Sequence, residues 1–479
     1  MRLFVSGIYD DRFYLHVSLY HSTPRLLFIY LSICDIWTDI LYNIPPCLPL
    51  SWPSPPRGGC SGMCDVNVFH SLMHPFSPKG KLVHFGLDAL DVAIRLVKAA
   101  STHVPTCVLR PNLFRVALTP ESATQLRRTS ELCPHLTTWL SVEDVITKLG
   151  MDNIASSSSS CCYGGLEMGN GCGVIHVPTY LEGLLRECEA RVEVGGGSVR
   201  WEVVRYDAPS DARGGEMGAK NESSSSSLSS SSIDVVAGSS SWDDVDAMNR
   251  RLGEYDAVIL CAGAGILHDG LIGNNGERSR LPVQLVRGQS IEMTLPTTTT
   301  TMTGDENYGS ISNEAVLCGK YVIPLPSNNT TSDDPASSSS SYRRYVIGAT
   351  HEFKDDPLAP EEVIDELRSR TYDLAKGLWD RGTIDGLTSG VRLQTNRGRF
   401  GRMPVVGRYR NDDDDVDESG GSSSGGISHR NSWIFAGLSS RGLIYHGLFG
   451  SWLADAVLRD DEERLRDEFA DFDWWRTTK

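Results

Sequence analysis

The stretch SWIFAGLSSRGLIYHGLFGSWLADAVLR, residues 432–459, decides the fold of this chain. The apolar run Trp433–Ala436 predicts a short buried strand, because a glycine stops it directly. Apolar residues then recur at helical spacing over 443–457, which predicts a helix. The residues between them, 437–442, form a tight strand-to-helix turn. Such a turn directs backbone N–H groups and the positive end of the helix at an anionic or electron-rich ligand.

Composition sets broad limits on size and partners. With 479 residues, of which 40% are hydrophobic, the chain can bury one large core or two domains. A net charge of −16 argues against nucleic acid as the main partner. The acidic runs 412–415 and 460–463 are typical of solvated loops. The 12 cysteines are scattered without CxxC or Cys/His spacing, so we expect reduced structural thiols and no metal site.

The N-terminal region carries no clear targeting signal. Residues 26–34 are apolar, but Asp35 and Asp39 follow, and the run is too short to span a bilayer. No basic region with a small-residue cleavage site precedes it, which argues against a secretory signal. We therefore expect a cytoplasmic protein without a membrane anchor, and an organelle transit peptide stays open.

Further segments, taken with 432–459, carry a resemblance to a known family. They read HSLMHPFSPKGKL (70–82), GVIHVPTYLEGLL (173–185), YDAVILCAGAG (255–265), LPVQLVRGQS (281–290), GKYVIP (319–324), YVIGAT (345–350), GVR (390–392) and MPVVG (403–407). In sequence and in order they resemble the D-amino-acid oxidase/glycine oxidase (DAO) superfamily of FAD-dependent oxidoreductases. The resemblance covers about residues 61–460.

The resemblance implies the fold class. It is α/β, with an FAD/NAD(P)-binding Rossmann-like domain interleaved with a mostly antiparallel β-sheet substrate domain. We expect this domain over 61–460, preceded by an atypical and disordered segment 1–60 and followed by an acidic tail 461–479. Serine, threonine and Gly/Ser runs cannot bury enough apolar surface to fold, so they predict disordered loop insertions. The insertions are expected at 151–170, 207–245, 296–310, 327–341 and 410–430.

One family feature is missing from the N-terminal segment. Members open with a strand, a GxGxxG turn and a helix, because the glycines let the backbone approach the FAD pyrophosphate. Residues 1–60 contain no such fingerprint. Either the sequence lacks its true first exon, which we favour, or the protein has lost ordinary FAD binding. Gly263 and Gly265 do not supply the missing GxGxxG fingerprint, because His268 stands where the third glycine would be. In the family context this segment is a late strand that passes beneath the FAD pyrophosphate.

The resemblance also implies where FAD would be contacted. Two groups of residues are involved, one on the strands of the nucleotide-binding sheet and one in the strand-to-helix turn. The implied contacts are Val204, Ala262 and Gly263 from the strands, and Gly437, Ser440, Gly442, Leu443 and Ile444 from the turn.

Three residues are implied substrate contacts: Tyr321, Arg392 and Arg441. In glycine-oxidase-like members the tyrosine of the GKYVIP strand faces the substrate carboxylate. Arg392 is the best single candidate, because an arginine fork pairs bidentately with a carboxylate. A structural salt bridge is the alternative role for Arg392. The rival arginines in 397–402 fall in a segment expected to be an exposed loop.

The implied function is FAD-dependent oxidation of the C–N bond of an amino acid or secondary amine, by hydride transfer to the flavin. Molecular oxygen or another acceptor would then take the electrons. No side chain is expected to be catalytic, because the flavin performs the chemistry when the substrate binds as the neutral amine. Two alternatives stay open. One is an enzyme acting on a modified tRNA nucleoside, which the acidic charge disfavours; the other is a non-catalytic or truncated family member, which the missing GxGxxG favours.

Overall fold

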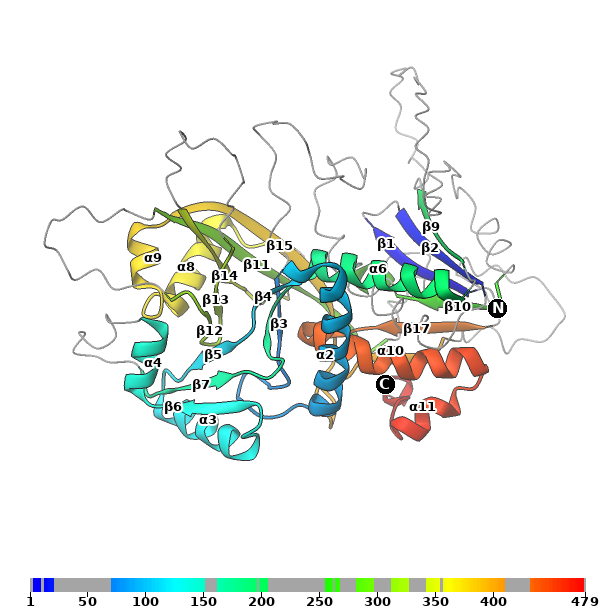
Figure 1. The fold of residues 1–479 in the computed structure, drawn as a ribbon, viewed down its shortest axis with the longest axis horizontal. Helices are drawn as coiled ribbons and strands as arrows, with labels where there is room; N and C mark the ends of the chain where they lie inside the picture. The colour runs from blue at the N-terminus through cyan, green and yellow to red at the C-terminus, as the bar shows by residue number, and fades with distance from the viewer. Residues whose placement is uncertain are drawn as a thin grey trace, which may run out of the picture.

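A computed structural model of the chain describes twelve ranges of residues. They are 3–9, 13–20, 70–150, 162–195, 198–205, 255–261, 263–267, 281–296, 312–326, 342–353, 356–409 and 431–477. They form a mixed α/β fold built on two large sheets. Figure 1 shows the six-stranded sheet on the right with α6 and α10 beside it, and the eight-stranded sheet on the left with α8 and α9.

The six-stranded sheet has the order β16-β17-β10-β1-β2-β9. Its strands are β1 (Leu3–Tyr9), β2 (Phe13–Tyr20), β9 (Ser198–Arg205), β10 (Ala257–Leu260), β16 (Val405–Arg408) and β17 (Ser432–Ala436). The central strands β1, β10 and β17 run parallel, whereas β2, β9 and β16 are antiparallel to their neighbours. This parallel centre is the Rossmann-like part of the predicted fold class.

Side chains of β10 and β17 alternate between two buried clusters. Ile259 and Trp433 lie in the cluster shared with the helices, whereas Val258 and Ile434 lie in a second cluster with Leu393 on the opposite face. Since successive residues of a strand point to opposite faces, both faces of this sheet are covered. This explains why the sequence shows apolar runs here and no polar alternation.

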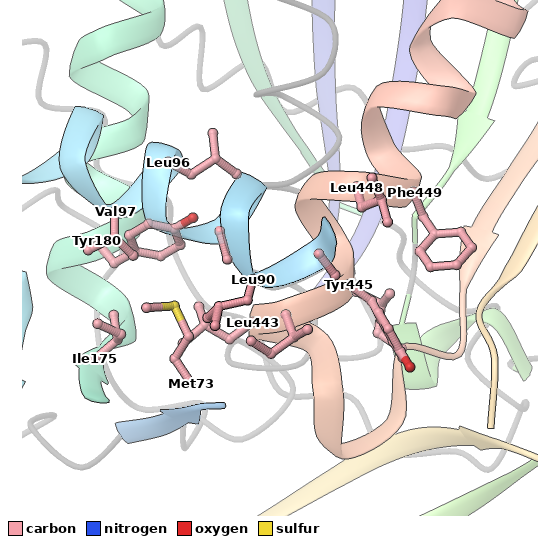
Figure 2. Packing of buried hydrophobic residues seen from close by; sticks show 14 of the residues in the cluster. Met73, Leu90, Leu96, Val97, Ile175, Tyr180, Leu443, Tyr445, Leu448 and Phe449 are labelled. Atoms are coloured by element: carbon pink, nitrogen blue, oxygen red, sulfur yellow. The ribbon is translucent and has the colours of Figure 1, made fainter. Parts of the chain in front are cut away.

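Three helices form the layer over the first face: α2 (Gly86–His103), α6 (Val177–Gly195) and α10 (Gly442–Arg459). Figure 2 shows Leu90 and Val97 of α2 packed against Tyr180 of α6 and Leu443 of α10. The helix α6 approaches α2 closely at Gly183. A Cβ there would lie 2.5 Å from the carbonyl oxygen of α2 residue 100, so only glycine fits.

The eight-stranded sheet has the order β15-β11-β14-β13-β12-β5-β7-β6. Its strands are β5 (Leu113–Val116), β6 (Thr137–Leu140), β7 (Gly165–Met168), β11 (Val283–Pro296), β12 (Ala315–Leu317), β13 (Tyr321–Pro324), β14 (Tyr342–Gly348) and β15 (Thr383–Thr395). All neighbours are antiparallel except β12 and β5. This is the antiparallel sheet that the fold class requires. The helices α8 (Pro360–Thr371) and α9 (Lys376–Arg381) cover its end, where Val363 and Leu378 pack with Ile291.

The remaining elements join or edge these two sheets. They are β3 (His70–Met73), β4 (Val108–Arg110), β8 (Gly173–His176), η1 (Pro105–Cys107), η2 (Gly263–Leu267), η4 (Ser439–Arg441), α3 (Pro120–Leu132), α4 (Val142–Leu149), α11 (Glu463–Glu468) and α12 (Trp474–Thr477). The strands β3, β8 and β4 form a small antiparallel sheet. The indole of Trp475 donates a hydrogen bond to the Val406 carbonyl at 3.1 Å, so the segment predicted as an acidic tail packs on β16.

The structure also departs from the sequence-based outline at several points. Within 1–60, predicted as disordered, β1 and β2 join the sheet because β1 pairs with the buried strand β10. The insertion predicted at 151–170 overlaps β7, which pairs with β5 and β6. The insertions predicted at 207–245, 327–341 and 410–430, and that at 296–310 beyond the last residue of β11, lie outside the described residues.

Candidate active site

The strand-to-helix turn lies where the two large sheets meet. Gly437 has a φ of +72°, and a Cβ there would lie 2.6 Å from Cγ2 of Thr395, the last residue of β15. The amide of Thr395 donates to Ser439 Oγ at 3.3 Å, and Ser439 Oγ donates to the Gly437 carbonyl at 3.2 Å. A backbone bridge joins Gln394 to Leu438. The turn is therefore fixed against the end of β15, and only glycine suits position 437.

The helix α10 starts directly after this turn without a capping side chain. Its N-cap residue, Arg441, makes no side-chain hydrogen bond to the first turn, so the first backbone N–H groups keep their capacity to donate. A Cβ on Gly442 would meet nothing closer than Leu438 at 3.9 Å. The side chains of Leu443 and Ile444 are buried in the core, so these two residues can face a ligand only through their backbone.

Two buried polar atoms mark the same junction. Gln394 is 3% exposed and Thr395 is 0% exposed, and neither Gln394 Oε1 nor Thr395 Oγ1 has a hydrogen-bond partner in the described part of the chain. Buried polar atoms are nearly always paired in native proteins. A ligand at the turn that carries an N–H donor would satisfy Gln394, so these residues fit the ring end of a flavin.

Arg392 lies two residues before Gln394 and therefore on the same face of β15. Its Nη2 donates a hydrogen bond to His351 Nδ1 at 2.9 Å. Because a guanidinium only donates, His351 accepts at Nδ1 and carries its proton on Nε2. Burial lowers the pKa of His351, and the positive charges of Arg392 and Arg402 lower it further. The imidazole is thus kept neutral, and it holds the arginine in place.

Tyr321 is also near the arginine, at the start of β13. Its hydroxyl lies 2.8 Å from Ser290 Oγ. Burial raises the pKa of Tyr321, and the bond to Ser290 and the charge of Arg392 partly oppose this effect. The phenol therefore stays neutral and able to donate. A Cβ on the neighbouring Gly348 would lie 2.2 Å from Ser290 Oγ and 2.6 Å from the Tyr321 hydroxyl, so the pair depends on this glycine.

Two further arginines approach from other segments. Arg441 Nη1 donates to the Arg402 carbonyl at 3.4 Å. Burial lowers the pKa of Arg402, and the charges of Arg397 and Arg441 add to this effect. The prediction of an exposed loop holds for Arg397 and Arg399 but not for Arg402, which is half-buried because its segment folds toward the turn. We call Arg392, Arg402 and Arg441 the arginine cluster.

The structure brings together most of the residues implied by the resemblance. The positive charge of Arg392 acts on the Tyr321 hydroxyl. Arg441 lies in the turn in which Leu438 forms a backbone bridge with β15. Ser440 is exposed in the same turn. The other implied cofactor contacts lie on the six-stranded sheet, where Val204 belongs to β9 and Gly263 starts η2. Ala262 lies outside the described residues.

Sequence reasoning missed three polar residues of the site: Ser290, His351 and Gln394. Each lies at or next to the end of a segment that the sequence did identify, namely 281–290, 345–350 and 390–392. A search for polar residues at the ends of the predicted strands would have found them. No metal-binding cluster of His, Cys, Asp and Glu occurs within the described ranges. The helices in those ranges also include none that is long and apolar enough to cross a membrane.

The connection after β1, where a dinucleotide pyrophosphate would be expected, does not have the strand-turn-helix arrangement found at 437–442. A dinucleotide pyrophosphate is normally held at the end of the first parallel strand, by a glycine-rich turn that opens a helix. Here β1 takes that position beside β10, but only three residues separate Tyr9 from Phe13 of the antiparallel β2. No helix fits into this connection. The turn at 437–442 and the end of β15 fit the ring end of a flavin, whereas the three residues between β1 and β2 are too few for the turn and helix that hold a pyrophosphate.

Comparisons with known proteins agree with the outline from sequence. The profile of the family described as FAD dependent oxidoreductase (DAO) matches residues 61–456. Similar solved structures include glycine oxidase from Geobacillus kaustophilus, with 15% identity, 79% of each chain covered and a TM-score of 0.44. They also include L-proline dehydrogenase from P. horikoshii, with 10% identity, 82% of this chain and 86% of that chain covered and a TM-score of 0.46.

A third similar structure is the fructosamine oxidase Amadoriase II from Aspergillus fumigatus. It shares 11% identity, covers 84% of this chain and 79% of its own, and has a TM-score of 0.45. No curated protein matches the chain.

Proposed function

The chain belongs to the family of FAD dependent oxidoreductases (DAO), and from that premise we propose that it oxidises the C–N bond of an amino acid or secondary amine with FAD. One observation carries the proposal. Arg392 and Tyr321 lie on the strands next to an uncapped strand-to-helix turn, and the turn is packed on the end of β15. This arrangement supports a substrate held beside the ring of a flavin.

The turn and the end of β15 supply the groups that would hold the cofactor ring. The uncapped N-terminus of α10 offers backbone N–H donors and the positive end of an 18-residue helix. Gln394 Oε1 offers a buried acceptor. FAD held by these groups would supply the acceptor for the hydride of the substrate carbon, and molecular oxygen or another acceptor would then take up the electrons.

The substrate side of the site orients an amino acid and adjusts its protonation. Arg392 would bind the carboxylate with its guanidinium, and the bond to His351 fixes the orientation of this side chain. The neutral Tyr321 hydroxyl would donate a further bond. Positive charge from the arginine cluster disfavours a substrate ammonium and favours the neutral amine. The chain's contribution is therefore binding, orientation and a lowered amine pKa, with no side-chain base.

The test is an absorbance spectrum of the purified protein supplied with FAD. We expect flavin bands near about 370 and about 450 nm, and bleaching of the longer-wavelength band when an oxidisable amino acid is added without oxygen. Bands without bleaching by any amine would contradict the proposed reaction while leaving cofactor binding intact.

A second candidate function is a non-catalytic member of the family. The three-residue connection between β1 and β2 favours it, because that connection leaves no room for the usual pyrophosphate-binding helix. Under this alternative the protein stays colourless after incubation with FAD. The same spectrum therefore separates the two candidates.

A further inference from the structure

The candidate site contains positive charge that no carboxylate of the described residues neutralises. Arg402 and Arg441 are both half-buried, and neither forms an ion pair with a carboxylate of the described ranges. Arg441 Nη1 donates a hydrogen bond to the Arg402 carbonyl at 3.4 Å. This is unexpected in a chain with 61 acidic and 45 basic residues.

Several other partly buried cations of the described fold have acidic partners. Lys320, on the same sheet as Arg392, lies 2.5 Å from Glu366. Arg344 lies 2.9 Å from a glutamate of β11 and Arg408 lies 2.6 Å from an aspartate that follows α10. Arg115, which is also buried, instead donates to the carbonyls of Ser77 and Pro78. Arg402 and Arg441 share one bond to a carbonyl and have no carboxylate partner among the described residues.

Neighbouring groups respond to the uncompensated charge. Burial lowers the pKa of His74 to about 3, and the charges of Arg115 and Arg441 contribute to the shift. Burial likewise lowers the pKa of His351, and there the contributing charges include Arg402. Titratable groups on two sides of the cluster thus experience the same positive potential.

The three arginines come from three segments that meet at one place. Arg392 is on β15, Arg402 precedes β16, and Arg441 ends the turn that forms a bridge with β15. A single carboxylate occupies one guanidinium fork. If Arg392 binds the carboxylate next to the reacting amine, the other two arginines are left without an anion.

We propose that the substrate carries a second acidic group, which Arg402 and Arg441 bind while Arg392 holds the first. The inference rests on the proposed function, because it names the class of amine that the same site would oxidise: an amino acid or secondary amine with two carboxylates. Its carbon skeleton places the second carboxylate toward the segment before β16.

The test compares simple carboxylates as ligands and needs no turnover. Isothermal titration of the protein with added FAD would measure the dissociation constants of butyrate, succinate and glutarate. We expect at least one dicarboxylate to bind about 10- to 100-fold more tightly than butyrate, as a second charge-assisted contact would provide. Equal affinity for butyrate and both dicarboxylates would overturn the inference.

Three variants assign the effect to individual residues. Arg402→Gln should weaken the binding of succinate and glutarate far more than that of butyrate, and so abolish the preference for dicarboxylates. Arg399→Gln is the matched control, since Arg399 is exposed and pairs with Asp471 at 3.0 Å, and it should change neither affinity. If both variants weaken succinate binding equally, the effect is long-range charge and the inference is wrong.

Arg392→Gln separates this inference from the proposed function. It should weaken butyrate and succinate alike, because both need the first carboxylate site. If butyrate binds through Arg392 without any gain for a dicarboxylate, the proposed function stands and only the second acidic group is refuted. If Arg392→Gln changes no affinity, the carboxylate site itself is refuted.

Discussion

Replacing His446 with asparagine should reduce the loss of stability that the protein suffers in acid. His446 is 0% exposed on α10 and lies 2.9 Å from both the Gly442 carbonyl and the Tyr180 hydroxyl. A carbonyl only accepts hydrogen bonds, so Nδ1 carries the proton and Nε2 accepts from the tyrosine. The imidazole must therefore be neutral in the folded protein, and its protonation would break the contact between α10 and α6.

The size of the effect follows from the pKa of His446. Burial lowers this pKa from 6.5 to about 4. When the pKa of a histidine is lower in the folded protein than in the unfolded chain, the unfolded chain binds the proton first as the pH falls. The histidine's contribution to stability is therefore complete above its unfolded pKa, and it is lost as the pH falls toward the folded pKa. Lowering the pH from about 7 to about 5 should therefore cost roughly 2 kcal/mol through this one residue.

Urea unfolding at these two pH values measures the effect. The variant His446→Asn keeps an acceptor for Tyr180 but cannot titrate, so it should lose roughly 2 kcal/mol less than the natural protein on acidification. Tyr180→Phe is the companion variant. It should be less stable by about 1–3 kcal/mol at neutral pH, because it leaves Nε2 buried without a donor. An equal acid-induced loss in His446→Asn and the natural protein would refute the reasoning.

Three further predictions concern the site and its supporting helices. Gly442→Val should fold normally, since its Cβ would meet nothing closer than Leu438 at 3.9 Å, but should not retain FAD in the absorbance spectrum. Arg392→Ala should retain FAD and weaken carboxylate binding about 10- to 100-fold in a titration. If Gly442→Val or Arg392→Ala lost both FAD and carboxylate binding, the assignment of the turn to the cofactor and of Arg392 to the substrate would be contradicted. Gly183→Leu should lower the free energy of unfolding by about 1–3 kcal/mol or more, because its Cβ would lie 2.5 Å from the Ala100 carbonyl oxygen, and unchanged stability would refute the close helix packing.

Much of the fold could be read from local patterns. The strand predicted at Trp433–Ala436 is β17, and the helix predicted over 443–457 is α10. These elements were predictable because strand and helix periodicity is a local property, and each buries one face or both faces as its pattern requires. The site residues that belong to such segments, Arg392 and Tyr321 among them, were identified with them.

The sequence by itself thus determined the elements, their family and the turn at 437–442. Tertiary structure alone decided how they combine. The segment Leu3–Tyr9 is apolar, but its sequence does not say where in a sheet it belongs. It pairs in parallel with β10, which lies more than 240 residues later in the chain. Arg402 lies in a polar loop by sequence, yet it is half-buried beside Arg441. Burial and charge environment depend on contacts between distant segments, and a local pattern carries no information about those contacts.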